Sequence, residues 1–516
     1  MRKLLRRTCR VLFSRYAISA MMIVLEVLFV TLLLVGNLYD SFLYLVVSSI
    51  LLSLVTFIVI LNRDANPEYK VTWTFIVLFL QPIGSILYYL FYQRRMSKKE
   101  TRLINGIVSL QREHPSSVEN MQSLERTCGL AAGKVRAIKA DYSPLELFRD
   151  SYAEFFGSGE ELFERLIEDI KGAKEYIFLE YFIIDEGELW DRIHTILREK
   201  AAMGVEVRLL YDDIGCMKTL PSRYELGLRR EGIKAYRFAR VNPRVSAVHH
   251  NRDHRKICIV DGKCAYTGGC NIADEYVNLI ERFGHWKDGG VRIEGLSVIG
   301  FIRMFLSLWD ITVRSVSDYS YYVDRVCASD RADGGYYVPF GTGPAPTYKR
   351  PAGKNVFLNI INQAKEYVYI TSPYLIIDFD LTGALCNAAL RGVDVRIITP
   401  GVADKKIIKV MTKSAYPKLM EAGVKIYEYS PGFIHEKTFI SDDEYAVIGT
   451  INLDYRSLVH HYEDALWSFR SPIALTARDE FLSTLEKSEL MDEKSARLGF
   501  SEWIFKCINQ LFAPLL

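Results

Sequence analysis

The sequence predicts an α/β fold in which two pseudo-symmetric lobes follow an N-terminal transmembrane helical region. Three observations predict it. Strand and helix patterns alternate in the same order twice along the chain, and one motif occurs in both repeats without a gap. Long uncharged stretches are concentrated in the first hundred residues. With 516 residues, the chain is long enough for several domains.

The first hundred residues contain three hydrophobic stretches. Residues 16–36 are apolar apart from Glu26, and residues 41–61 and 71–92 carry no charge. Each stretch can cross a bilayer core, which requires about 20 residues. We therefore predict that residues 1–100 form a membrane anchor with two or three hydrophobic helices, and that Glu26 faces protein or is protonated.

The basic residues predict how this anchor is oriented. The runs at 2–15 and 93–102 are rich in Arg and Lys, which favour the cytoplasmic side. Residues 81–84 (QPIG) interrupt the third stretch with Pro and Gly, which can turn a segment back. We predict a multi-pass protein of the cell membrane with two crossings, a re-entrant or interfacial hairpin and cytoplasmic lobes. A third full crossing is the alternative.

The rest of the chain repeats one pattern of strand, helix and strand. Residues 173–185 resemble residues 364–378, and residues 204–212 resemble residues 392–400. The last residues of the chain form an amphipathic tail that can dock on the lobes or lie on a bilayer. The predicted boundaries are 101–139 for a basic helical linker, 140–330 for the first lobe, 331–495 for the second lobe and 496–516 for the tail.

The motif found in both lobes joins a histidine to a lysine. His254 and Lys256 match His435 and Lys437 within the shared pattern His-x-Lys-x4-Asp-x6-Gly-[Gly/Thr]-x-Asn. Residues i and i+2 of a strand point to one face, so each histidine projects together with its lysine. A buried lysine is costly unless an anion meets it. Two such pairs therefore predict a phosphate site with an imidazole on each side.

This arrangement favours group transfer through a covalent intermediate. Imidazole has a pKa of about 6.5, so one histidine can be neutral and attack phosphorus while the other protonates the leaving alkoxide. An acceptor hydroxyl then reverses the roles. The predicted intermediate is a phosphohistidine, and this chemistry requires no cofactor.

Small and amide residues that follow each pair are predicted to support the phosphate. Gly268, Gly269 and Thr450 let the chain come close to the phosphate, and Asn271 and Asn452 can donate hydrogen bonds to its oxygens.

Asp261 and Asp442 complete the two motifs and are counted among the candidate catalytic residues. They can be active-site carboxylates or can pair inside the fold, and we favour the structural role because an anion beside the phosphate opposes binding. A metal site is the other interpretation of His with Asp, but a lysine aimed at the same point repels a cation. We therefore predict no metal.

These residues resemble the phospholipase D superfamily, whose signature is this His-Lys-Asp motif in two copies. Within it, the chain is similar to the bacterial cardiolipin synthases over nearly its whole length. Those relatives usually carry two hydrophobic segments, whereas this chain has three. The stretches that carry the resemblance are residues 251–276, 284–295, 372–378, 433–458 and the hydrophobic residues 66–91.

The resemblance implies a two-lobe enzyme that converts two phosphatidylglycerols into cardiolipin and glycerol through a phosphohistidine. It also implies that His254 is the nucleophile and His435 the acid. A carboxylate after each motif is expected to orient a histidine. We assign Glu463, eleven residues after Asn452, to His435, and Asp288, at a different spacing, to His254.

Other functions are compatible with the same motifs. A hydrolase of the phospholipase D type or another phosphatidyltransferase is the main alternative, and an inactive lipid-binding protein is a third. A nuclease is disfavoured, because 65 basic against 62 acidic residues create no global field for nucleic acid. The expected partners are phosphatidylglycerol and membrane lipids. The second lipid, phosphatidylglycerol or phosphatidylethanolamine, and the oligomeric state stay open.

Overall fold

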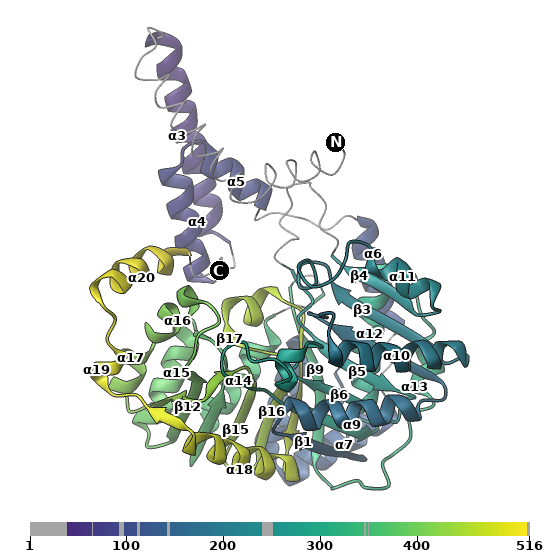
Figure 1. The fold of residues 1–516 in the computed structure, drawn as a ribbon. Coiled ribbons are helices and arrows are strands. Elements are labelled where there is room, and N and C mark those ends of the chain that lie inside the picture. The colour runs from purple at the N-terminus through teal and green to yellow at the C-terminus, as the bar shows by residue number, and fades with distance from the viewer. Residues whose placement is uncertain are drawn as a thin grey trace. The chain divides into compact units, whose positions relative to one another are not determined.

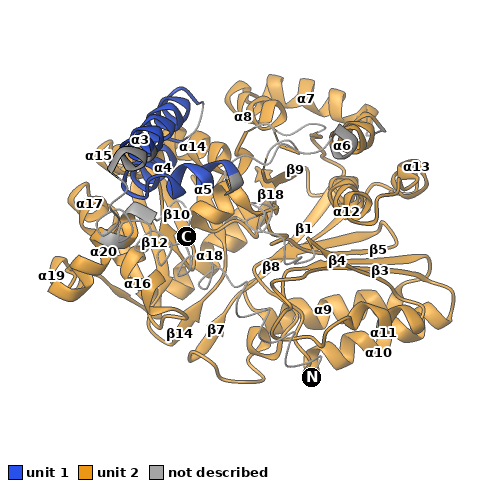
Figure 2. Cartoon of the chain, turned by 90° about the horizontal axis from the view of Figure 1, so that it is seen from above, with its two compact units in different colours: residues 1–95, 241–249, 511–516 blue, residues 96–240, 250–510 orange. Residues whose placement is uncertain are grey.

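The computed structural model describes residues 39–512, apart from 64–65, 92–97, 111–113, 142–144, 240–250, 345–346 and 349. The predicted hydrophobic stretch at 16–36, with Glu26, lies outside the described residues. The chain divides into two compact units (Figure 2). Unit 1 contains residues 1–95, 241–249 and 511–516, and unit 2 contains residues 96–240 and 250–510.

Unit 1 is helical where it is described. Helix α3 spans Tyr39–Leu61, α4 spans Pro67–Phe79 and α5 spans Ile83–Phe91. The third predicted stretch is therefore two helices, broken near the Pro and Gly that predicted a turn. Gly84 lets α5 approach α4, because a Cβ there would lie 2.1 Å from the carbonyl oxygen of Ile76. Among the described residues, no helix combines the length and the apolar character required to cross a membrane.

The first lobe of unit 2 is built on a seven-stranded sheet (Figure 1). Its strand order is β1-β8-β6-β5-β2-β3-β4, in which β2, β3 and β4 are parallel and the other neighbours are antiparallel. The strands are β1 Ser151–Phe156, β2 Tyr176–Tyr181, β3 Glu206–Asp212, β4 Lys234–Phe238, β5 Lys256–Val260, β6 Cys264–Gly268 and β8 Gly290–Gly295. The helices are α9 Gly159–Gly172, α10 Glu188–Ala202 and α11 Tyr224–Arg230.

The second lobe has an eight-stranded sheet with the order β19-β13-β12-β10-β15-β16-β18-β9. The strands are β9 Tyr336–Thr342, β10 Tyr367–Thr371, β12 Asp394–Pro400, β13 Lys425–Tyr429, β15 Thr438–Ser441, β16 Tyr445–Gly449, β18 Glu463–Phe469 and β19 Ser488–Leu490. A separate pair is formed by β11 Leu375–Ile376 and β17 Leu453–Asp454. The helices are α14 Ala352–Gln363, α15 Phe379–Leu390, α16 Lys406–Lys413, α17 Tyr416–Glu421 and α18 Pro472–Glu486.

The two sheets correspond strand for strand. Read from β1 and β9, the first sheet has the order β1-β8-β6-β5-β2-β3-β4 and the second has β9-β18-β16-β15-β10-β12-β13, with β19 added at the edge. Parallel pairing occurs in the same three strands of each sheet. This correspondence confirms the predicted α/β fold with two repeated lobes.

Two helices join the lobes. Helix α12 (Val298–Val313) packs on β5 of the first sheet and on β9 of the second, and α18 packs on β15 of the second sheet and on β1 of the first. Their buried apolar side chains belong to one hydrophobic core that includes residues of both sheets. Burial of this shared surface stabilises the two lobes as one unit.

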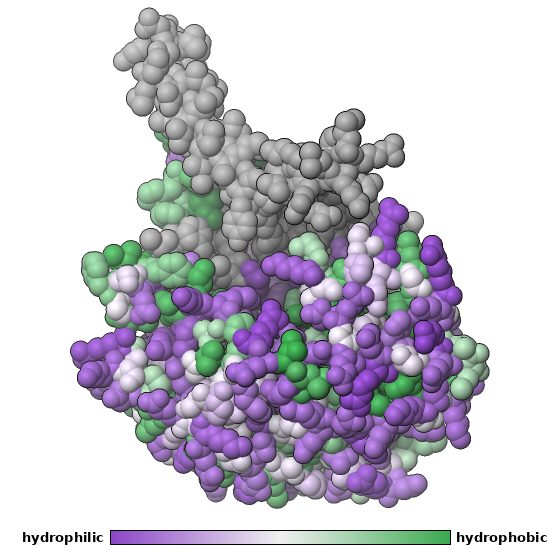
Figure 3. All heavy atoms as spheres, in the orientation of Figure 1, coloured by the Kyte–Doolittle hydropathy of each residue, from purple (hydrophilic) through white to green (hydrophobic). Residues whose placement is uncertain are grey.

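Shorter helices surround the lobes. The predicted linker contains α6 Lys98–Leu110, α7 Pro115–Thr127 and α8 Gly129–Asp141, and the tail contains α19 Glu493–Ala496 and α20 Phe500–Phe512; α13 spans Tyr319–Val323. Helix α20 exposes Phe500, Trp503 and Ile504, and hydrophobic residues cover much of it in the space-filling view (Figure 3).

Candidate active site

The structure brings the two His-Lys pairs together inside unit 2. His254 precedes β5 and Lys256 begins it, while Lys437 directly precedes β15. His435 follows the short strand β14 (Gly432–Ile434). All four side chains are buried. Burial lowers the pKa of His435 and of Lys437, and the positive charge of Lys256 lowers both further, so Lys256 lies close enough to the second pair to act on it.

His435 is hydrogen-bonded to a carboxylate of the other lobe. Its Nδ1 donates to Asp288 Oδ2 at 2.7 Å, and Asp288 lies just before β8 of the first sheet. The approach is set by a parallel pair between β14 and β7 (His285–Lys287). There the backbone N–H of His435 donates to the carbonyl of Lys287 at 2.7 Å. A short inter-lobe ladder therefore aligns this dyad.

His254 forms the equivalent dyad in the opposite direction. Its Nδ1 donates to Glu463 Oε2 at 2.8 Å, and Glu463 begins β18 of the second sheet. Asp253 and Tyr462 form a parallel bridge, and the backbone N–H of His254 donates to the carbonyl of Tyr462 at 2.9 Å. We place each ring proton on Nδ1 because an ionised carboxylate only accepts, which leaves Nε2 without a proton and able to act as a nucleophile.

These contacts correct the pairing predicted from the sequence. That prediction assigned Glu463 to His435 and Asp288 to His254, each within its own lobe. In the structure Glu463 contacts His254, and Asp288 contacts His435. Each dyad therefore needs both lobes.

The two carboxylates occupy equivalent positions despite their different spacings. Asp288 lies two residues before Gly290 of β8, and Glu463 lies two residues before Ala465 of β18. Gly290 and Ala465 each pair with the last residue of the neighbouring strand, which is a glycine in both sheets. The two register pairs are Gly268 with Gly290 and Gly449 with Ala465. Asp288 comes later in the sequence because the loops before it are longer; each lobe has one short helix in this segment, Asp274–Val277 in the first and Arg456–His460 in the second. The spacing differs and the structural position does not.

Burial sets the protonation states of the unliganded site. It lowers the pKa of His254 to about 3 and that of His435 to about 4, so both imidazoles are neutral at pH 7. The sequence predicted one neutral and one protonated histidine. Burial also lowers the pKa of Lys256, and it lowers that of Lys437 to about 7. A bound anion opposes all four shifts, because a nearby negative charge favours the cationic forms.

The matched positions 269 and 450 support the two carboxylates differently. Thr450 Oγ1 donates to Glu463 Oε2 at 2.5 Å, and Ser457 Oγ donates to Oε1 at 2.6 Å. Gly269 makes room instead, because a Cβ there would lie 1.9 Å from Asp288 Oδ1. The sequence predicted that Gly269 and Thr450 serve the phosphate directly. In the structure Thr450 contacts the carboxylate of Glu463, and Gly269 leaves space for that of Asp288.

This close approach predicts the effect of adding one methyl group. Gly269→Ala should lower kcat roughly 100-fold, because the new Cβ must displace Asp288 from His435 and small misplacements cost that much. Steady-state turnover measures kcat, and circular dichroism checks folding. Thr450→Ser keeps the hydroxyl and is the matched control, with little loss expected. A fully active Gly269→Ala enzyme would contradict the orienting role of Asp288.

Asp261 and Asp442 do not reach the histidines. Asp261 follows β5 at the end opposite His254 and accepts hydrogen bonds of 2.8–2.9 Å from the backbone N–H groups of residues 174–176. Asp442 accepts three at 2.9–3.0 Å from residues 365–367. Each aspartate fixes the start of a neighbouring strand. Counting them as catalytic is therefore corrected in favour of the structural role.

The two asparagines differ in their surroundings. Asn271 Oδ1 accepts from the backbone N–H of Ile183 at 3.0 Å, and its Nδ2 donates to the hydroxyl of Tyr276 at 2.7 Å. These contacts lie within the first lobe and do not support the predicted contact with phosphate. Asn452 is buried at the matched position, and its phosphate contact stays a prediction. Gly268 admits the neighbouring strand, since a Cβ there would lie 2.5 Å from the Cα of Gly290.

Ring side chains not singled out from the sequence pack on both histidines. The centroid of Trp286 lies 5.7 Å from that of His435, and those of Phe182 and His461 lie 5.0 and 5.6 Å from that of His254. Trp286 and His461 each lie two residues before an orienting carboxylate. Alternation along a strand could have identified both once those carboxylates were known.

One group near the site has donors suited to a cation. The ligand atoms of His254, His461 and Glu463 lie within 4.8 Å of one another. The contact between His254 and Glu463 already orients the imidazole, and Lys256 Nζ donates to the carbonyl of His254 at 2.6 Å. The positive charge of Lys256, which also lowers the pKa of His254, opposes a metal ion beside it, so we assign no metal to the group.

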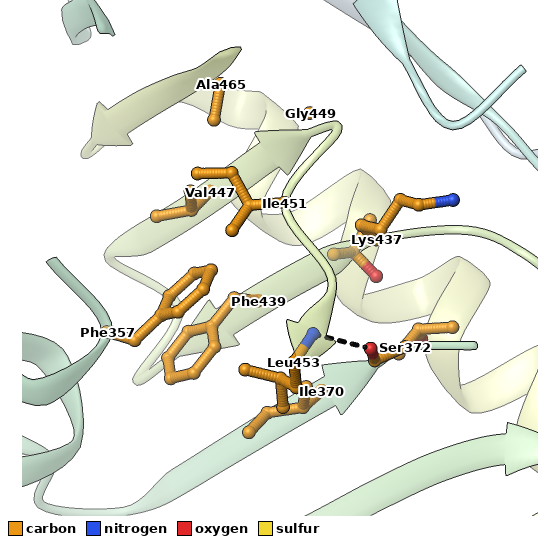
Figure 4. Close-up of a pocket in the computed structure, with 12 residues that line it drawn as sticks. Phe357, Ile370, Ser372, Lys437, Phe439, Val447, Gly449, Ile451, Leu453 and Ala465 are labelled. Carbon is orange, nitrogen blue, oxygen red and sulfur yellow. Dashed lines mark hydrogen bonds between the residues drawn. The ribbon is translucent and has the colours of Figure 1, made fainter. Parts of the chain in front are cut away.

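Behind Lys437 the second lobe has a small, mostly apolar cavity (Figure 4). The hydroxyl of Ser372 accepts a hydrogen bond from the backbone N–H of Leu453 at 3.1 Å, which fixes the chain after Asn452. These apolar surroundings contribute to the burial that lowers the pKa of Lys437. The apolar side chains of the wall include Phe357, Ile370, Phe439, Val447 and Ile451.

Comparisons with known families match both halves of this site. The model described as "Cardiolipin synthase, PLD-like domain" matches residues 166–281 and 357–485, so each match contains one His-Lys pair. The model described as "Phospholipase_D-nuclease N-terminal" matches residues 51–91.

Individual relatives match most of the chain. An uncharacterized protein of Streptococcus mutans is 37% identical over 89% of this chain and 98% of its own. A cardiolipin synthase of Halalkalibacterium halodurans is 31% identical over 89% of this chain and 91% of its own. The crystal structure of phosphatidylserine synthase from Haemophilus influenzae shares the fold, with a TM-score of 0.56 at 15% identity over 74% of this chain and 100% of that chain. The chain is an enzyme and belongs to the cardiolipin synthase family of the phospholipase D superfamily.

Proposed function

We propose that this enzyme joins two phosphatidylglycerol molecules into cardiolipin and releases glycerol, through a phosphohistidine. The observation that carries the proposal is the pair of buried dyads, each made by both lobes and each accompanied by a lysine. Two equivalent dyads suit a reaction whose second step reverses the first. A phosphodiester supplies the anion that two buried ammonium groups require.

In the first step His254 Nε2 attacks the phosphorus of one phosphatidylglycerol. The bond from phosphorus to the glycerol headgroup oxygen breaks, and His435 gives its proton to that oxygen as glycerol leaves. Lys256 and Lys437 offset the negative charge of the phosphoryl oxygens. Asp288 stabilises the His435 imidazolium through the hydrogen bond at 2.7 Å, and Glu463 holds the tautomer of His254 that attacks.

In the second step the headgroup hydroxyl of another phosphatidylglycerol enters. Neutral His435 takes the hydroxyl proton while the oxygen attacks phosphorus, and the bond from phosphorus to His254 breaks. The proton count is restored after each turnover, so no outside acid is consumed. Phosphatidylethanolamine in place of one phosphatidylglycerol is the alternative lipid, and water as acceptor gives the hydrolase reaction.

The low pKa values of the unliganded histidines predict proton uptake on binding. His435 is neutral at pH 7 in the empty site, because burial lowers its pKa to about 4, yet the first step needs its imidazolium. A bound anion raises that pKa, and also that of Lys437 from about 7, so binding draws about one proton or more from solvent. Calorimetric titration with tungstate in two buffers of different ionisation enthalpy measures the uptake. His435→Gln should reduce it, and zero uptake by the unmodified enzyme would contradict this protonation scheme.

Product analysis tests the proposed reaction. Purified enzyme in vesicles of labelled phosphatidylglycerol should yield cardiolipin and glycerol in equal amounts. Phosphatidic acid as the main product would indicate a hydrolase. Cardiolipin that forms only when phosphatidylethanolamine is added would assign the second lipid differently.

We also propose that the first hundred residues attach the enzyme to the cell membrane, with the lobes in the cytoplasm. Exposed apolar side chains along α3 and the matching N-terminal family model support attachment. Glu119→Cys, in a background without the exposed Cys327 and Cys507, should resist a membrane-impermeant maleimide in intact cells. Ready labelling would place the lobes outside.

A further inference from the structure

The loop that follows β3 carries an exposed apolar residue close to His254. Phe182 packs on His254, and the carbonyl of Phe182 accepts a hydrogen bond from Cys216 Sγ at 3.5 Å. Met217, the next residue, is 55% exposed, and the neighbouring Lys218 is exposed as well. Phe182 therefore contacts both His254 and Cys216, the residue directly before Met217.

The loop before β7 has the same relation to His435. Trp286 packs on His435, and its backbone forms two hydrogen bonds with the side chain of Asn278. The backbone N–H of Trp286 donates to Asn278 Oδ1 at 2.7 Å, and Asn278 Nδ2 donates to the backbone carbonyl of Trp286 at 3.0 Å. The next residues, Leu279 and Ile280, are 46% and 50% exposed. This loop belongs to the segment that lengthens the spacing of Asp288.

Two exposed lysines lie on another segment that adjoins the loop before β7. Lys405 and Lys406, which follow the end of β12, are exposed. The backbone N–H of Val402 donates to the carbonyl of Gly432 at 3.2 Å, and Gly432 pairs with His285 of β7. The segment after β12 therefore adjoins the loop before β7.

We propose that these residues are a lipid-facing rim of the active site. Met217, Leu279 and Ile280 enter the edge of the hydrocarbon region of an anionic phospholipid bilayer, and Lys218, Lys405 and Lys406 contact its headgroups. This proposal rests on the proposed function and adds the surface by which the reacting lipid is reached. It requires the two catalytic histidines to work at the level of the lipid phosphates.

The placement of these residues distinguishes the rim from ordinary surface. Isolated exposed apolar residues are common on soluble proteins. Here they flank both histidines, on loops at the ends of strands where α/β folds bind ligands, and lysines lie beside them. Apolar side chains with neighbouring lysines match the chemistry of an anionic bilayer surface. A soluble phosphate ester would need the lysines but not the apolar tips.

Photocrosslinking tests the rim directly. Benzoylphenylalanine at position 217 or 280 of the full chain, in phosphatidylglycerol vesicles, should label lipid at least about fivefold more than at two control positions. The controls are Met203 and Leu390, which are 75% and 72% exposed and lie just before β3 and β12, at the opposite ends of those strands. Equal labelling at all four positions would overturn the proposal. A lack of lipid labelling at both 217 and 280 would also overturn it.

Kinetics separates this proposal from the proposed reaction. Ile280→Asp should raise the KM measured by surface dilution in mixed micelles about tenfold, with a much smaller fall in kcat, while Leu390→Asp should leave KM unchanged. An unchanged KM for Ile280→Asp would count against the rim. Lipid labelling should persist in a His254→Ala background, because it needs no turnover. Labelling without any cardiolipin product would retain the rim and reject the proposed reaction.

Discussion

Replacing His254 or His435 with alanine is expected to abolish cardiolipin formation, with a loss on the order of 10⁴-fold or more for each variant. Each imidazole has a separate task in the proposed reaction, one as nucleophile and one as acid and base, and neither lysine can substitute. Both side chains are buried within one site, so water cannot easily replace them. Product formation from labelled phosphatidylglycerol measures the loss.

Matched histidines separate catalysis from folding in this experiment. His194 Nε2 lies 2.6 Å from Glu231 Oε2 in the first lobe, outside the site, and His194→Ala should keep nearly full activity. Both catalytic variants should remain folded and bound to membranes. If either retained more than a few per cent of activity, its histidine would be neither nucleophile nor acid.

Acid-quenched trapping then assigns the nucleophile. With labelled phosphatidylglycerol, the phosphatidyl group should appear on the peptide that contains His254. The two dyads have similar Nδ1-to-carboxylate distances, 2.8 and 2.7 Å, which do not rank them, although Lys437 Nζ also lies 2.7 Å from His435 Nδ1. Label on the His435 peptide, with none on that of His254, would exchange the two roles.

Much of the fold could be predicted because the sequence repeats itself. Matched strand patterns on both sides of two helical patterns define equivalent sheets, and the structure has them in corresponding order. The His-Lys pairs could be found because alternation along a strand places residues i and i+2 on one face. Both observations depend on local periodicity, which a single sequence displays directly.

The pairing of each histidine with a carboxylate could not be predicted in this way. Sequence spacing compares residues within one repeat, whereas the dyads form between repeats through the Asp253–Tyr462 bridge and the β7–β14 pair. The roles of Asp261 and Gly269 were obscured for a related reason. Their partners, the start of β2 and the carboxylate of Asp288, are distant in sequence and near only in the folded chain.

The two halves of the site also differ in ways that the shared motif conceals. At matched positions, Trp286 packs on His435 and His461 packs on His254, so only one dyad has a second imidazole beside it. Glu463 accepts from Thr450 and Ser457 in addition to His254. Burial raises the pKa of Glu463, but the interactions with His254, followed by those with His461, outweigh burial and hold that pKa well below its usual range.

Removing the charge of either orienting carboxylate should lower kcat roughly 10²- to 10⁴-fold. Glu463→Gln and Asp288→Asn keep the size of each side chain, but an amide neither stabilises an imidazolium nor fixes the Nδ1–H tautomer as a carboxylate does. Both variants should fold, because each replacement keeps the size and shape of the original side chain. Their losses for phosphatidylglycerol alone would not reveal which histidine each serves.

A substrate with a better leaving group distinguishes the two dyads. Phosphatidyl-4-nitrophenol releases a phenolate that needs no proton, so the acid dyad becomes dispensable in the first step. Because Asp288 contacts His435, Asp288→Asn should release nitrophenolate within about tenfold of the unmodified enzyme, while Glu463→Gln should remain slow. The opposite pattern has two meanings, which the trapped intermediate separates. With the label on His254, it would reject the inter-lobe pairing and restore the pairing predicted from sequence. With the label on His435, the inter-lobe pairing would stand and the roles of the two histidines would exchange.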